Sequence, residues 1–329
     1  MSSGRDPVDR AAGDSQDLYD VSDWEPRSAV DRLAVAVHGS IRPILRWVLI
    51  LLGVLILAAL FALGSLGAVL DPFVGAFVLL SAVPALLLAL YIWRADVTSG
   101  EPLDLLVATF VLAVLFAGFA GVLNDFGSVL QAIDFGVVGL GSVLFFYLVV
   151  GPIEEIVKML AVRLWAYRSP RFDSVVDGAV YGAVAGLGFA TIENALYITR
   201  FMEDGGVFSI AFVRALAGPG HVVYSGIAGY YLGLAKFNRE NAGPIAVKGI
   251  LVAAFVHATY NVTVGVVPPV VADATALGQG TAFVGYIVLY VGLAGLYLLR
   301  KISRYKSVYR AVNANRDHQP TPERTEFEG

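Results

Sequence analysis

Several apolar segments longer than about 18 residues limit what this chain can fold into more than any other feature of its sequence. A segment of that length crosses a bilayer as an α-helix, because a helix satisfies its own backbone hydrogen bonds where water is absent. The composition, 57% hydrophobic and 15% charged over 329 residues, excludes an ordinary soluble domain. The sequence therefore predicts an all-α polytopic membrane protein.

Eight segments are predicted to span the membrane. They cover about Leu45–Leu70, Phe73–Trp93, Leu105–Leu123, Val138–Trp165, Gly178–Ile198, Phe208–Leu234, Ile245–Val267 and Thr281–Leu299. In the sixth, Gly218-Pro219-Gly220 is expected to break the helix partway. Lys and Arg concentrate in alternate connections, with little beyond Arg200 and Arg214 on the other side. By the positive-inside rule, we expect an integral protein of the cell membrane with both termini in the cytoplasm.

The polar ends of the chain are set apart from these spans. We expect a disordered acidic cytoplasmic tail at 1–40, three helices at 41–137, a core of four helices at 138–267, a final helix with a basic flank at 268–310, and a disordered tail at 311–329. The net charge of −4 comes largely from the tails. The sequence therefore indicates the lipid bilayer as a partner and no nucleic acid.

Two adjacent glutamates and a lysine lie inside the fourth span, in the segment Gly151-Pro152-Ile153-Glu154-Glu155-Ile156-Val157-Lys158. Each charge inside a membrane helix costs roughly 2.5–3.5 kcal/mol on insertion scales, so an unused pair is hard to explain. Glu154 and Lys158 share a helix face, and we expect this ion pair to make Glu154 the ionised base. Glu155 faces about 100° away and has Met159 four residues on. One Glu–Lys pair would indicate a structural link between helices, whereas the second glutamate favours a functional site.

The fifth span carries a third carboxylate, Glu193. Glycines recur every fourth residue at Gly178, Gly182 and Gly186, which lets a neighbouring helix approach closely, and Glu193 falls on the same face. The alternative is that Glu193 lies at the outer edge of the membrane and faces water.

The sixth and seventh spans each hold a histidine, His221 and His257, and Asn261 follows His257 by one turn. A lone histidine inside a membrane usually makes a hydrogen bond between helices. These two occur in the same four consecutive spans as three glutamates, which favours a shared site. Glutamate, histidine and asparagine are ligand and acid–base types found in hydrolytic sites.

Several hydrolytic patterns are absent from the sequence. There is no His-Glu-x-x-His, no Gly-x-Ser-x-Gly, no pair of membrane aspartates and no cysteine. What remains for hydrolysis is a water molecule activated by carboxylate, histidine or metal.

Taken in order, these residues resemble one known family. Glu154-Glu155-x-x-Lys158, Phe189-x-x-x-Glu193, a membrane His221 and His257-x-x-x-Asn261 are similar to the motifs of the PrsW family of intramembrane proteases. They resemble more distantly the CAAX prenyl endopeptidase and bacteriocin-processing superfamily. The resemblance covers about residues 140–265. It departs from the CAAX endopeptidases at Glu193, where those proteins have histidine.

The resemblance implies an intramembrane peptidase, of metalloprotease or glutamic type, that cuts a membrane-anchored protein such as a regulatory factor. It implies that Glu154 or Glu155 activates water, and that His257 with Asn261 positions the reacting carbonyl. It also implies zinc, because one Glu and two His leave an open position on the metal, with Glu193, His221 and His257 as ligands. Residues 138–267 then form the catalytic core. Its catalytic residues would be Glu154, Glu155, Lys158, Glu193, His257 and Asn261.

Two functions of other classes use the same polar residues. In a proton-coupled transporter the glutamates and histidines would form a relay, but the halves of the chain show no inverted repeat. In a non-catalytic membrane scaffold, as in the Aph-1 subunit that the superfamily includes, both glutamates of the pair would not be needed. Cleavage of a tagged single-span protein would favour the protease.

Overall fold

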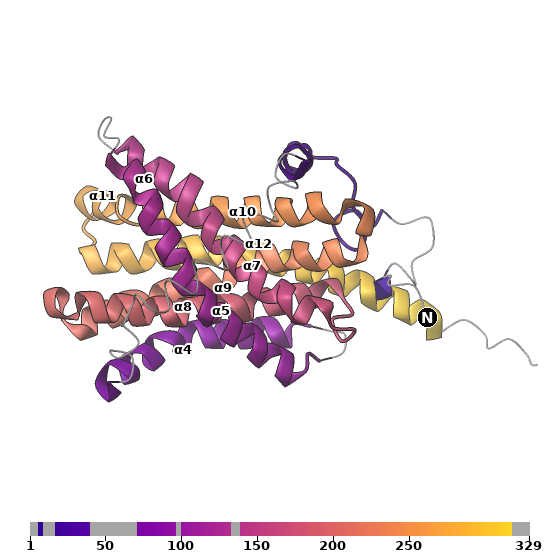
Figure 1. The fold of residues 1–329 in the computed structure, drawn as a ribbon, viewed down its shortest axis with the longest axis horizontal. Helices are drawn as coiled ribbons and strands as arrows, with labels where there is room; N and C mark the ends of the chain where they lie inside the picture. Colours follow the sequence, from indigo (N-terminus) through magenta and orange to yellow (C-terminus); the bar gives the residue numbers. More distant parts are fainter. Residues whose placement is uncertain (1–5, 9–16, 40–70, 97–99, 133–138, 318–329) are drawn as a thin grey trace, which may run out of the picture.

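The computed structural model describes residues 6–8, 17–39, 71–96, 100–132 and 139–317, and these residues contain helices and no β-strand. The helices are α4 (Pro72–Arg94), α5 (Leu103–Gly127), α6 (Leu140–Phe145), α7 (Gly151–Leu164), α8 (Val175–Gly205), α9 (Val207–Phe237), α10 (Ala242–Thr263), α11 (Val267–Ala274) and α12 (Gln279–Asp317). Short helical turns lie at Ser128–Ala132, Phe146–Val150, Ala166–Arg168 and Arg239–Asn241. Most of the long helices run roughly along one direction, while α5 and the α6–α7 segment cross them obliquely (Figure 1).

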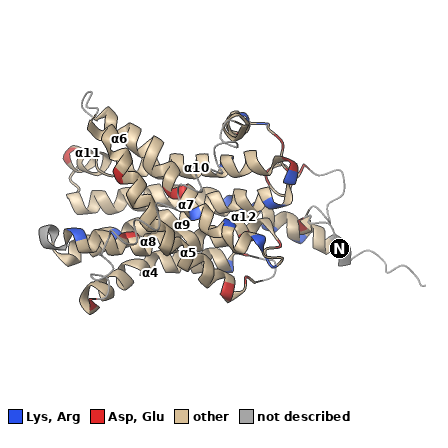
Figure 2. Cartoon of the chain, in the orientation of Figure 1, with Lys and Arg blue, Asp and Glu red and all other residues tan. Residues whose placement is uncertain are grey.

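Seven helices in the described residues are long and apolar enough to cross a membrane. They correspond to the second through eighth predicted spans, so the prediction of an all-α polytopic membrane protein is confirmed. The first predicted span, Leu45–Leu70, lies outside the described residues. Lys and Arg gather toward the end of the bundle where α4 ends and α5 begins (Figure 2). We call this the basic end.

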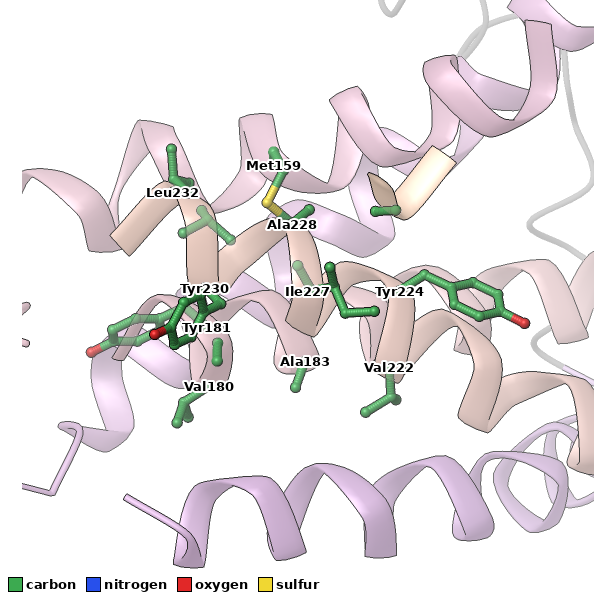
Figure 3. Packing of buried hydrophobic residues seen from close by; sticks show 14 of the residues in the cluster. Met159, Val180, Tyr181, Ala183, Val222, Tyr224, Ile227, Ala228, Tyr230 and Leu232 are labelled. Carbon is green, nitrogen blue, oxygen red and sulfur yellow. The ribbon is translucent and has the colours of Figure 1, made fainter. Parts of the chain in front are cut away.

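The α8 and α9 helices form the centre of the bundle, and their glycines make this possible. A Cβ added at Gly182 would lie 2.2 Å from the backbone oxygen of Ser225, and one at Gly186 would lie 2.3 Å from that of His221. Only glycine allows so close a backbone approach. Around this contact the apolar core continues, with Tyr181 and Tyr230 at one end of the drawn cluster and Tyr224 at the other (Figure 3).

The predicted break in the sixth span is wrong, because α9 continues through Gly218-Pro219-Gly220. Proline removes one backbone donor from a helix, and membrane helices tolerate this loss where neighbouring helices support the turn. Here Gly218 packs on α4 and α8: a Cβ at that position would lie 3.3 Å from Ala85 and 3.9 Å from Ala190.

Residues 17–39, which the sequence places in a disordered tail, are folded against the basic end. Trp24 is 2% exposed, and residues 29–39 are helical. Asp20 pairs with Lys301 at 2.5 Å and with Lys248 at 3.4 Å, and Asp31 also pairs with Lys248. The acidic residues of this segment therefore pair with lysines of α10 and α12. The aspartate-rich sequence had led us to expect that they would stay in water. At the other end of the chain, residues 311–317 continue α12.

Candidate active site

The polar residues of the sequence motifs lie around one buried centre. α7 carries Glu154, Glu155 and Lys158, α9 carries His221, and α10 carries His257. Each of these five side chains is at most 5% exposed. The structure thus brings together residues that are more than 100 positions apart in the sequence, as in the contact of 3.0 Å between His257 Nδ1 and Glu155 Oε1.

The turn before the glutamates sets the position of α7. A π-helical turn at Phe146–Val150 comes directly before Gly151 and Pro152, and Pro152 has no N–H to donate. Turns of this wider kind are frequent at functional sites. A Cβ on Gly151 would lie 2.6 Å from the backbone oxygen of Ala254, so α7 and α10 approach closely at this point. That approach places Glu155 within reach of His257.

Both carboxylate oxygens of Glu155 are in contact with polar neighbours. Lys158 Nζ donates to Oε1 at 2.7 Å, His257 Nδ1 contacts the same oxygen at 3.0 Å, and the Ser225 hydroxyl donates to Oε2 at 3.1 Å. We expected Lys158 to pair first with Glu154, and the structure corrects this, because Lys158 Nζ lies 3.8 Å from Glu154 Oε2. The ammonium group turns toward Glu155 because His221 Nδ1, on the facing helix, accepts from it at 3.0 Å.

Glu154 is left partly unsatisfied. Its Oε1 accepts from Asn124 Nδ2 of α5 at 3.0 Å. Its Oε2 is buried and has no hydrogen-bond partner in the described part of the chain. Oε2 lies 3.7 Å from His257 Nε2 and 3.8 Å from Lys158 Nζ. A buried carboxylate oxygen without a partner is costly, so its position favours a role toward something that binds there.

The two histidines present their ring nitrogens to different partners. Lys158 can only donate, so Nδ1 of His221 is the acceptor and the ring proton lies on Nε2, 2.8 Å from Glu193 Oε2. Glu155 orients His257 through Nδ1, which leaves Nε2 of His257 facing Glu154. The two rings meet edge to face with centroids 5.0 Å apart. His257 thus has a carboxylate on one nitrogen that orients the other, which is the usual arrangement behind a metal-binding histidine.

Glu193 belongs to the same centre and is held by an arginine that sequence reasoning assigned to the outer side. Arg214 donates to Glu193 Oε2 at 2.5 Å and, through Nε, to Asn194 Oδ1 at 2.9 Å. Asn194 donates in turn to the hydroxyl of Ser81 on α4 at 2.9 Å. The alternative that Glu193 faces water is not what the structure shows, since its side chain is 19% exposed and paired with both Arg214 and His221.

Sequence reasoning also missed Asn124 and Ser225, which hold the two glutamates. Asn124 lies close to the end of its helix and Ser225 is a small residue inside a long helix, and neither position shows in the sequence which helix the side chain faces, so only the fold identifies them. Asn261, by contrast, was predicted as a site residue. It lies one turn after His257 and is half-buried, and no hydrogen bond of its side chain is found among the described residues.

The residues of this centre fit a metal ion. One carboxylate oxygen of Glu154 and one ring nitrogen each of His221 and His257 all lie within 4.8 Å of one another, and all three residues are buried. Two imidazoles with a carboxylate are a donor set of catalytic zinc sites, and the unpartnered Oε2 of Glu154 lies beside it. Glu193 touches this group through His221.

This fold and this centre define a class: a polytopic helical membrane protein that encloses a Glu/His site among its spans. Residues 101–294 match the sequence model of a family described as PrsW family intramembrane metalloprotease, and the chain belongs to this family. It is therefore an integral membrane protein and an intramembrane peptidase that acts on protein.

Two similar proteins named Protease PrsW come from Bacillus subtilis and Geobacillus kaustophilus. The first is 33% identical over 192 residues, which cover 56% of this chain and 82% of that protein. The second is 34% identical over 188 residues, covering 56% and 79%. A protein of the same name from Clostridioides difficile is 28% identical over 56% of this chain and 76% of its own. No solved structure matches the chain at a significant level.

Proposed function

We propose that this peptidase hydrolyses a peptide bond of a membrane-anchored protein with a water molecule activated by Glu154. The observation that carries the proposal is the buried Oε2 of Glu154, which has no hydrogen-bond partner among the described residues. A general base needs a free lone pair directed at the water, and both oxygens of Glu155 already contact Lys158, His257 or Ser225, whereas Oε2 of Glu154 has no such partner in the described residues.

In this scheme Glu154 accepts the proton of the water and later returns it to the leaving amine. Glu155 and Lys158 act on the site without touching the substrate: Glu155 orients His257, and Lys158 balances the charge of the glutamates. The environment is dry, so charge interactions between these groups are stronger than they would be in water. Asn261, one turn from His257, is expected to contact the reacting carbonyl.

A metal at this centre would be held by His221 and His257 with Glu193 as the third ligand. When bound, zinc would polarise the carbonyl and make its bound water more acidic. The close approach of Glu154 to both histidines fits a base that stands next to the metal-bound water. It also supports a second assignment, in which Glu154 is itself the third ligand.

The substrate side of the proposal rests on the membrane setting. A site enclosed by α7, α8, α9 and α10 is reached by a chain that is itself anchored in the bilayer. The gathering of Lys and Arg at the basic end supports cytoplasmic termini (Figure 2). Family membership favours this function over the transporter and the scaffold.

The test is a cleavage assay in liposomes with a tagged single-span protein. Wild type should release a fragment, and Glu154→Gln should lower the rate by about 10²–10⁴-fold, the range attributed to a general base. Asp125→Asn, which changes an exposed acid at the end of α5, is the matched control and should cleave normally. Equal cleavage by wild type and Glu154→Gln would contradict the proposal.

A further inference from the structure

A second group of carboxylates lies at the basic end, away from the Glu/His centre. Asp96 follows α4, Glu101 precedes α5, and Asp177 is in the first turn of α8. One carboxylate oxygen from each lies within 4.8 Å of the other two. By the helical rise of 1.5 Å per residue, Asp177 is about 24 Å along α8 from Glu193, so the two centres are separate.

Two buried side chains, one in this cluster and one a turn away from it, lack a hydrogen-bond donor or acceptor of the ordinary kind. Glu101 is only 6% exposed, and neither of its carboxylate oxygens accepts a hydrogen bond from a donor in the described residues; the polar group beside it is the Asp96 carboxyl. Tyr181 lies one turn after Asp177 on the same face of α8 and is fully buried, and its hydroxyl is equally without a partner there. Glu101 and Asp177 are the charged groups that act most strongly on this hydroxyl.

Such an arrangement is costly unless something with positive charge joins it. Burial, and then the neighbouring Asp96, raise the pKa of Glu101 to about 9. Three carboxylates that converge on one point supply the hard oxygen ligands that Ca²⁺ and Mg²⁺ prefer. The N-terminus of α8, capped by Ser174 and Asp177, adds only a partial positive charge.

We propose that Asp96, Glu101 and Asp177 bind a divalent cation, Ca²⁺ or Mg²⁺. The ion joins Asp96, just after α4, and Glu101, just before α5, to the start of α8, the helix that carries Glu193 into the active site. Tyr181 lies beside the ion and directs its hydroxyl at the ligands or at an ion-bound water. The site is structural, and it is independent of whether a metal takes part in peptide hydrolysis.

The experiment uses the full chain in detergent, stripped with a chelator and titrated with Tb³⁺, a probe for oxygen-ligated calcium sites whose emission is excited through nearby tyrosine. Wild type should show saturable emission that Ca²⁺ displaces. Glu101→Gln should weaken Tb³⁺ binding at least tenfold. Asp173→Asn, an acid just before α8 that lies outside the cluster, is the matched control and should bind within about twofold of wild type.

Thermal unfolding distinguishes a bound cation from the alternative in which two of the carboxyl groups share a proton. Ca²⁺ should raise the Tm of wild type and of Asp173→Asn, and should leave Glu101→Gln unchanged. In chelator, Glu101→Gln should be at least as stable as wild type, because it removes a carboxyl that is buried among other carboxyls. The proposal is overturned if Glu101→Gln binds Tb³⁺ as wild type does, or if Ca²⁺ has no effect on wild type while Glu101→Gln is the less stable protein.

Discussion

Two buried groups of charged residues in this protein differ in how completely their charges are paired. At the basic end, Asp20 and Asp31 of the N-terminal segment both form ion pairs with Lys248. We call this group, with Lys301, the N-terminal clasp. In the Glu/His centre, both oxygens of Glu155 have hydrogen-bond partners, whereas Glu154 keeps one buried oxygen without a partner among the described residues.

The difference separates charges that hold the fold from charges that do chemistry. A buried carboxylate with its lysine in place is stable and chemically inert, because its lone pairs are already used. An unsatisfied one lowers stability and is retained where it binds a ligand or takes a proton. Loss of Glu154 or His257 should therefore reduce activity more than stability, loss of the paired Lys158 should reduce both, and changes in the clasp should reduce stability more than activity.

The largest expected effect comes from His257→Ala. This change removes both the ring nitrogen that faces Glu154 and the group that Glu155 orients. We expect activity to fall by about 10³-fold or more and bound zinc to be lost. Cleavage rate and metal analysis of the purified variant check this. If His257→Ala cleaved at more than a tenth of the wild-type rate, the shared centre would be wrong.

The second-largest effect is expected from Lys158→Met. Lys158 is fully buried and contacts Glu155 and His221, so its loss leaves Glu155 without a counter-charge. Removing one partner of a buried pair costs about 3–5 kcal/mol, and we expect a lower Tm together with an activity loss of about 10²-fold. Lys158→Arg is the control that keeps the charge. Activity and stability both near wild type in Lys158→Met would show that the lysine is dispensable.

Arg214→Met should have an intermediate effect on cleavage, and this effect should come from weaker metal binding. Arg214 touches Glu193 and not the proposed base, so it acts through the position of Glu193. We expect zinc to bind about tenfold more weakly, as on loss of a group behind a metal ligand, while saturating zinc restores most of the cleavage. Arg200→Met, an arginine at the same end of the bundle but outside the network, should bind zinc normally. Unchanged zinc affinity in Arg214→Met would remove Glu193 from the ligand set.

Lys248→Met should change activity by less than about twofold while it lowers Tm, because it breaks the clasp at a distance from the centre. Lys248 is 5% exposed and pairs with Asp20 and Asp31. Lys306→Met, outside these pairs, is the control for loss of one positive charge at the basic end. A loss of cleavage as large as that of Lys158→Met would show that the clasp and the centre are not distinct.

The smallest effect concerns pH and the clasp. Burial acts to raise the pKa of Asp31, but Lys248, Tyr19 and Ser28 outweigh it, so the pKa lies below the ordinary value. A carboxyl with a lowered folded-state pKa contributes stability above its unfolded pKa of about 3.9 and loses it as the pH falls further. Acid unfolding should therefore begin at higher pH in Lys248→Met than in wild type. Identical acid curves would show that the pair adds no pH-dependent stability.

Much of the fold was readable from the sequence because hydrophobic length and glycine spacing are local properties. The seven spans in the described residues appear where they were predicted, and Gly182 and Gly186 face α9 as their spacing indicated. The unbroken α9 was not readable, since the support for the turn at Pro219 comes from neighbouring helices. The N-terminal clasp could not be predicted from the sequence either, because the lysines that pair with Asp20 and Asp31 lie more than 200 residues away.

The candidate site divides in the same way. Glu154, Glu155, His221 and His257 stand out in the sequence because charged or ring-nitrogen groups are rare within apolar spans. The partners of these residues do not stand out in the sequence. Helical spacing allows Lys158 to pair with Glu154, but His221 on a facing helix draws the ammonium group toward Glu155. Arg214 lies in the first two turns of α9, near the start of its span, so that sequence alone could not show that it pairs with Glu193.

The central claim is that Glu154 is the base and not a metal ligand, and zinc content measured beside cleavage rate in Glu154→Gln tests it most directly. Gln keeps the shape of the side chain and its hydrogen bond to Asn124, but cannot take a proton. We expect Glu154→Gln to bind as much zinc as wild type and to cleave about 10²–10⁴-fold more slowly. Loss of the zinc together with activity would contradict it and would assign Glu154 to the metal.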